Sequence, residues 1–174
     1  DTAESMAREL GKIESFDDEE AKNLYRTIGL GALKYFILKV DPKKNMLFNP
    51  AESVDFNGNT GPFIQYTYAR IKSVLRKAAE AGYEVNSEAS TSVELVSFEK
   101  DLLRKIHDFP TVVEQAAALH SPAVIANYAY ELASEYNRFY HELTILKEEN
   151  PAIRTLRLSL SQFTARVLAN ALWL

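Results

Sequence analysis

The sequence predicts an all-α protein: an antiparallel helical bundle preceded by a helical segment and a short strand or irregular connection. Three observations favour this fold class. Apolar residues recur at steps of three and four along most of the chain, which is the period of an amphipathic helix. Prolines stand where helices would begin, and the segments between helices are mostly short. The 174 residues, 47% of them hydrophobic and 25% charged, suit one ordinary globular domain or two small ones.

The first predicted helix runs over about 17–40. The acidic residues of its first turn favour a helix N-terminus, because they complement the positive end of the helix dipole. Gly29 and Gly31 lie inside this helix, where each costs about 1 kcal/mol relative to alanine, and we expect them to mark a close contact with another helix. After it, residues 43–59 are predicted to form a connection with one short strand around 46–48.

Pro62 follows a Thr60-Gly61 turn at the first position of the next predicted helix, and Gly82 is a good C-terminal stop. Further helices are predicted over 93–107, 111–119, 122–149 and 151–174. The substantial helices after Pro62, joined by mostly short loops, predict an antiparallel bundle. The last helix continues to Leu174 without a stop signal, so we expect the chain to be truncated at its C-terminus.

Composition excludes several classes of protein. Cysteine is absent, which removes disulfides, thiolate metal sites and cysteine nucleophiles. No apolar run approaches the roughly 18 residues that a membrane-spanning helix needs, and the first residues lack the pattern of a signal peptide. We therefore expect a soluble cytoplasmic protein without membrane contact. The net charge of −4 gives no global attraction for nucleic acid.

No catalytic or metal site is expected. His107, His120 and His141 have no acidic residue three positions before them and form no His-x-x-x-His pair. The sequence also lacks a P-loop, a G-x-G-x-x-G run and a G-x-S-x-G run.

The basic residues are nevertheless gathered into two helical stretches. Residues 62–82 carry four basic side chains and one acidic, and residues 151–174 carry three basic and none acidic. Steps of four, three and four place four side chains on one face of the first stretch: Tyr66, Arg70, Ser73 and Lys77. Aromatic rings stack on unpaired bases and cations hold phosphates, so such a face is typical of single-stranded RNA binding. An ordinary solvated helix face is the alternative. If the two basic stretches converge, they would form one outward-facing groove edged by tyrosine rings.

The segment 55–71, which reads DFNGNTGPFIQYTYARI, resembles a segment of the arginyl-tRNA synthetase family. In that family a turn rich in glycine, asparagine and aspartate leads through Thr-Gly-Pro into a Gln-Tyr-x-x-Ala-Arg helix. Segments 29–35, 137–140, 157–160 and 167–172 also fit the family and occur in its order. The resemblance covers essentially the whole chain.

The resemblance implies two parts. Residues 1–56 are similar to the C-terminal end of the catalytic and stem-contact region. Residues 57–174 are similar to the helical DALR-type anticodon-binding domain, truncated at its C-terminus, although the string DALR itself does not occur. The family's ATP-binding sequences, of the HIGH and KMSK types, are absent. The full enzyme would use ATP and arginine to charge tRNA, whereas this fragment would hold neither and be inactive alone.

The resemblance also implies partners and site residues. The partners would be the anticodon arm of arginine tRNAs and the remainder of the chain's own synthetase, with the protein a monomer. Tyr66 and Tyr140 are expected to stack or pack near the anticodon loop, and Arg70, Lys77 and Arg154 to contact phosphates. With two further positions from the family motifs, the predicted RNA-binding residues are Gln65, Tyr66, Arg70, Lys77, Asn137, Tyr140 and Arg154.

A helical protein–protein docking or scaffold domain without RNA binding is the alternative from another class. It would need an exposed apolar patch and no convergence of the two basic stretches.

Overall fold

The computed structural model describes residues 17–47, 49–53, 55–56, 58–83, 85 and 93–174. Within these residues every regular element is a helix, which confirms the predicted all-α class. The helices are α2 (Asp18–Leu38), α3 (Pro50–Ser53), α4 (Gly61–Glu80), α5 (Ser97–His107), α6 (Phe109–Leu119), α7 (Pro122–Glu142) and α8 (Pro151–Trp173). None of the helices in the described part is long and apolar enough to span a bilayer.

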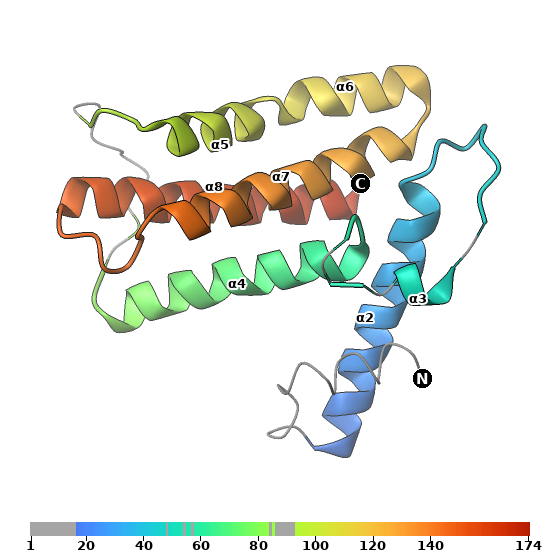
Figure 1. Cartoon of the computed structure of the whole chain (residues 1–174), viewed down its shortest axis with the longest axis horizontal. Helices are drawn as coiled ribbons and strands as arrows, with labels where there is room; N and C mark the ends of the chain where they lie inside the picture. Colours follow the sequence, from blue (N-terminus) through green and yellow to red (C-terminus); the bar gives the residue numbers. More distant parts are fainter. Residues whose placement is uncertain (1–16, 48, 54, 57, 84, 86–92) are drawn as a thin grey trace.

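The helices after residue 60 form the predicted antiparallel bundle. Figure 1 shows α4, α7 and α8 side by side, with α5 and α6 end to end along the outer side of α7. Successive elements alternate in direction: α4 and α7 run one way, and α5–α6 and α8 run the other (Figure 1). Helix α2 crosses the end of the bundle at a steep angle and packs on α4 and α7.

The bundle core is made where α4, α7 and α8 face one another. Its largest fully buried apolar side chains come from these three helices and from α5: Tyr136, Phe139, Ile64, Ile71, Leu102, Leu132, Leu158 and Leu168. Tyr128 and Tyr136 are buried and Tyr68 packs half-buried against the core, as the apolar stripes of the sequence indicate. The tyrosines left on the surface are therefore the candidates for contact with another molecule.

The turn before α4 brings that helix close to α2. Thr60 caps α4 by accepting a hydrogen bond from the Phe63 amide at 3.3 Å. Gly61 then lies so near α2 that a Cβ atom built on it would stand 2.7 Å from the Gly31 carbonyl oxygen and 3.1 Å from Tyr35 Cβ. For Gly31, the close helix contact expected from the sequence is present.

Replacing Gly61 with alanine should destabilise the protein by about 1–3 kcal/mol, because the added methyl group meets backbone that cannot yield locally. Gly31→Ala is the matched control. Its methyl group would meet the amide end of the Gln65 side chain, which can rotate away. Because Gly31 lies in a helix interior, where alanine is more favourable than glycine by about 1 kcal/mol, this gain offsets part of the cost of Gly31→Ala. Urea unfolding of both variants measures the difference, and equal destabilisation would contradict this account.

Besides shifts of one or two residues, the structure differs from the sequence prediction at the connection after α2, at the start of α5 and at the end of α7. The described part of the connection after α2 is irregular, with no strand at Met46 or Leu47, while residue 48 lies outside the described residues. Helix α5 begins at Ser97 rather than near 93, because the Glu99 carboxylate accepts a hydrogen bond from the Val96 amide at 2.9 Å. Thr91 and Ser92, either of which would cap a helix that begins at 93, lie outside the described residues.

Helix α7 ends at Glu142, and the predicted extension to Glu149 is wrong. Leu143 is extended, and residues 143–150, called the α7–α8 loop below, fold back along the bundle. Ile145 is buried in this loop, and Asn150 caps α8 by accepting from the Ala152 amide at 2.9 Å. The apolar spacing of Leu143 and Leu146 continues the stripe of α7, so the local pattern concealed the break.

Candidate nucleic-acid interface

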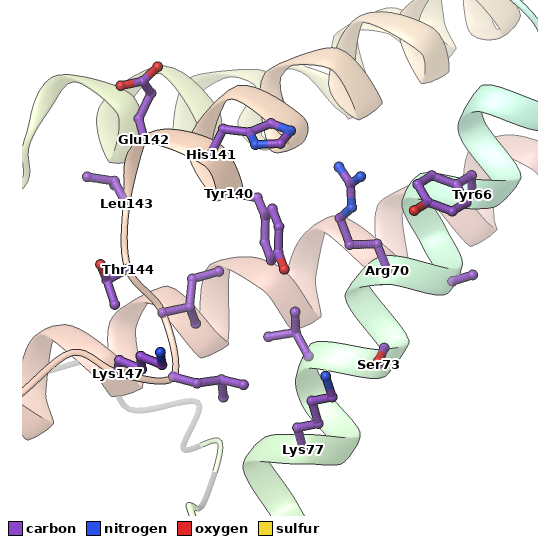
Figure 2. A pocket seen from close by; sticks show the side chains of 14 residues that line it. Tyr66, Arg70, Ser73, Lys77, Tyr140, His141, Glu142, Leu143, Thr144 and Lys147 are labelled. Atoms are coloured by element: carbon purple, nitrogen blue, oxygen red, sulfur yellow. The ribbon is translucent and has the colours of Figure 1, made fainter. Parts of the chain in front are cut away.

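A groove of about 640 Å³ lies between α4, the C-terminal end of α7 and the α7–α8 loop (Figure 2). The four α4 residues predicted to share a face all line it, which follows from their helical spacing. Its polar and charged lining residues are Tyr66, Arg70, Ser73, Lys77, Tyr140, His141, Glu142, Thr144 and Lys147. The groove thus combines side chains from two helices and a loop that are distant in the sequence.

Arg70 occupies the centre of this arrangement. Its guanidinium carbon lies 5.0 Å from the centroid of the Tyr66 ring and 5.1 Å from that of Tyr140. Arg70 also donates a hydrogen bond to the side-chain oxygen of Asn137, whose amide nitrogen donates to Thr67 Oγ1 at 2.8 Å. Figure 2 shows the Arg70 guanidinium between the two rings. The cation–π contacts hold one charge and two flat aromatic surfaces in a fixed relation.

Both rings remain accessible. Tyr66 and Tyr140 are each 36% exposed, whereas Tyr136, which stacks behind Tyr140 with 6.4 Å between ring centroids, is fully buried. Burial raises the pKa of Tyr136 to about 12, so its hydroxyl stays protonated and donates to Ser161 Oγ at 3.2 Å. Tyr140 therefore rests on a neutral, buried ring, and Arg70 lies over its ring at the groove.

The groove is positively charged. Arg70, Lys77 and Lys147 line it, against the single carboxylate of Glu142 among the lining residues of the described part. Lys77 and Lys147 are exposed and come from opposite sides of the groove, α4 and the α7–α8 loop. Cations on both walls of a concave surface concentrate the local positive potential, which attracts phosphate groups.

Three of the predicted site residues do not line the groove: Asn137, which accepts a hydrogen bond from Arg70, Gln65 and Arg154. Gln65 points to α2, where its amide nitrogen donates to the Thr27 carbonyl oxygen at 3.4 Å, and it does not line the groove. Arg154 lies at the start of α8, with its guanidinium carbon 4.1 Å from the centroid of the Tyr83 ring, and it donates to the Glu148 carbonyl oxygen at 2.7 Å. The second basic stretch, on α8, therefore does not form a wall of the groove as the sequence suggested.

The α7–α8 loop supplies the wall that sequence analysis missed. Thr144 and Lys147 of this loop line the groove beside His141 at the end of α7. The only local signals are the β-branched pair Thr144-Ile145 and the Asn150-Pro151 stop. Among the described residues no group of histidine and carboxylate side chains is arranged to hold a metal ion.

Comparison with known families gives the class of this protein. The family model described as "DALR anticodon binding domain" matches residues 64–174, a span that includes α5 to α8, nearly all of α4 and every lining residue of the groove. The chain belongs to the DALR anticodon binding domain family.

Within that family, the chain is similar to arginine–tRNA ligases. It is 55% identical over 174 residues to the arginine–tRNA ligase of Phocaeicola vulgatus, covering 100% of this chain and 29% of the relative. Over 167 residues it is 55% identical to the arginine–tRNA ligase of Bacteroides thetaiotaomicron, covering 96% of this chain and 28% of the relative. The chain thus spans under a third of the length of these relatives.

Solved structures agree with the sequence comparison. Thermus thermophilus arginyl-tRNA synthetase superposes with a TM-score of 0.82 at 33% identity, covering 98% of this chain and 29% of the other. Arginyl-tRNA synthetase from Plasmodium falciparum superposes with a TM-score of 0.77 at 26% identity, covering 99% of this chain and 29% of the other. The similarity to the arginyl-tRNA synthetase family stated from the sequence is confirmed.

Proposed function

We propose that this chain binds the anticodon stem-loop of arginine tRNAs through the groove, as the recognition part of an arginyl-tRNA synthetase. The observation that carries the proposal is the Arg70 guanidinium held between two half-exposed tyrosine rings inside a positively charged groove. Single-stranded RNA is bound by stacking its bases on aromatic rings and by neutralising its phosphates, and the groove offers both kinds of group within reach of one another.

The groove suggests roles for five of the seven predicted residues. Tyr66 and Tyr140 supply rings for stacking, and Lys77 supplies a phosphate contact. Asn137 has its side-chain oxygen bonded by Arg70 and its amide nitrogen bonded to Thr67, so we assign it to positioning Arg70. Arg154 lies outside the lining of the groove. We therefore assign it to phosphates of the anticodon stem rather than to those of the loop.

We propose that residues 57–174 form the binding module and that residues 1–56 belong to the neighbouring catalytic and stem-contact region. The start of the family match at residue 64 and the separate direction of α2 support this division. In the complete synthetase the chain would act as part of a monomeric enzyme that charges tRNA with arginine. ATP and arginine would bind outside this segment.

A second surface favours contact with protein. Between α2, α6 and the end of α8 lies an apolar groove of about 590 Å³, lined among others by Leu38, Val113, Ile125 and Leu172. Leu172 is 52% exposed beside it. Because the chain spans about 29% of its relatives, we assign this surface to the remainder of a synthetase chain. This contact is compatible with RNA binding, since no residue lines both grooves.

Binding to an anticodon-arm RNA hairpin, measured by filter binding at two ionic strengths, tests the proposal. Affinity should fall steeply with salt, with a slope of about −0.7 to −0.9 per phosphate contacted. Lys77→Ala should reduce that slope by about 0.7 to 0.9, since one contact is lost. Lys72→Ala is the matched control: it removes an equal charge from α4 outside the groove, so its slope should match the unmodified protein. Absent or salt-independent binding would leave the docking alternative.

A further inference from the structure

The α7–α8 loop is fastened to the bundle by one buried arginine. Arg157 of α8 donates from Nη1 to the Thr144 carbonyl oxygen at 2.7 Å and to Glu148 Oε2 at 2.8 Å. These two bonds reach opposite ends of the loop segment that forms the groove wall. Arg157 thus spans the loop from behind, on the side away from the groove lining.

Arg157 is itself fixed from the other direction. Its Nε lies 2.7 Å from Glu99 Oε1 of α5, and the side chains of Arg157 and Glu99 are 8% and 1% exposed. The other Glu99 oxygen accepts from the Val96 amide at 2.9 Å, so the carboxylate has one orientation. A guanidinium held by a buried carboxylate is a rigid support, because its planar fork cannot rotate without breaking charged hydrogen bonds.

The supported loop carries functional groups into the groove. Thr144 and Lys147 line it, and Lys147 is the only cation that the loop brings to the lining among the described residues. The loop has no helical or sheet hydrogen bonds to define its shape. The backbone hydrogen bond inside it, from the Glu148 amide to the Ile145 oxygen, is long at 3.4 Å. Its shape therefore depends on side-chain contacts, which are the burial of Ile145 and the hydrogen bonds from Arg157 and Arg154.

We propose that Arg157 is a positioning residue for RNA binding: through Thr144 and Glu148 it holds the α7–α8 loop so that Lys147 faces the phosphates of the bound RNA. The inference rests on the proposed function and extends it to residues outside the predicted site. A loop already ordered before binding spares the RNA complex the entropy cost of ordering it, so loss of the support should weaken binding.

Glu148→Gln weakens the support, because the charge-assisted bond from Arg157 becomes a weaker bond to a neutral amide oxygen, and it leaves the buried Arg157–Glu99 pair intact. Removing a negative charge beside an RNA site should by itself tighten binding. Positioning predicts the opposite sign, a loss of about 2- to 10-fold, as expected for ordering a loop side chain on binding. Glu142→Gln is the matched control, because it removes the same charge at the groove without changing a partner of Arg157. This control variant should bind RNA more tightly than the unmodified protein.

A double-variant cycle with Lys147→Ala completes the test. If Glu148 acts through Lys147, then Glu148→Gln should cost little further affinity in the Lys147→Ala background. Additive losses, or tighter binding by Glu148→Gln, would overturn the inference. Thermal unfolding checks that each variant is folded; if Glu148→Gln melts below the assay temperature, Glu148→Asp replaces it, which keeps the charge but shortens the reach. Failure of the unmodified protein to bind would instead overturn the proposed function.

Discussion

Replacing Arg157 with methionine is expected to lower the free energy of unfolding by about 3–5 kcal/mol, as is typical when one partner of a buried ion pair is removed. Glu99 is 1% exposed, and it would lose the cation that compensates its charge. The Thr144 carbonyl oxygen and the Glu148 carboxylate would lose their donors at the same time. The cost arises from stranded charge and polar groups rather than from lost apolar packing, since methionine fills a similar volume.

Urea unfolding followed by circular dichroism measures this loss, with two comparison variants. Arg166→Met removes an exposed arginine of the same helix, whose guanidinium carbon lies 5.6 Å from the Phe163 ring centroid, and should cost no more than about 1 kcal/mol. Adding Glu99→Gln to Arg157→Met should recover part of the stability, because the stranded charge is neutralised while the bond from the Val96 amide is kept. A loss below about 1 kcal/mol for Arg157→Met would show that the buried pair contributes little.

Arg157 also explains where sequence reasoning stopped. The starts of α2, α4 and α8 were predictable because their signals are local: the acidic first turn at Asp17, the Thr60 cap and the proline at position 151 all act within a few residues. The end of α7 is not local, since the loop after it is held by an arginine on the following helix. In the sequence Arg157 counted as part of a basic surface, although its charge is buried against Glu99.

In the candidate site, too, the part set by local spacing was predictable and the part set by packing between helices was not. The spacing of Tyr66, Arg70 and Lys77 defines one face of α4 whatever surrounds it, and these residues do line the groove. Which element stands opposite is decided by packing: α7 and its loop face α4 there, while Arg154 of α8 is engaged by Tyr83 and the Glu148 carbonyl oxygen. Gln65, one position from Tyr66, already points to α2. The family motif singled out Gln65 but did not indicate to which side of α4 its side chain points.

Replacing both Tyr66 and Tyr140 with alanine is expected to reduce RNA affinity the most. Stacking contributes about 1–3 kcal/mol per base, so the loss of both rings should cost about 2–6 kcal/mol if each holds one base. That corresponds to a fall in affinity of at least about 30-fold. The two rings share Arg70, 5.0 and 5.1 Å away, so each single variant should also loosen the guanidinium and the losses should not be strictly additive.

The corresponding phenylalanine pair separates stacking from hydrogen bonding. Tyr66→Phe with Tyr140→Phe keeps both rings and their contact with Arg70, so RNA affinity should stay within about threefold if stacking is the main term. Titration with the anticodon-arm hairpin measures all three proteins, and thermal unfolding shows whether the alanine pair remains folded, as expected for side chains that are 36% exposed. If the alanine pair binds as tightly as the unmodified protein, the RNA lies on another surface. If the phenylalanine pair loses as much affinity as the alanine pair, the hydroxyl groups make the contacts and the rings are only their support.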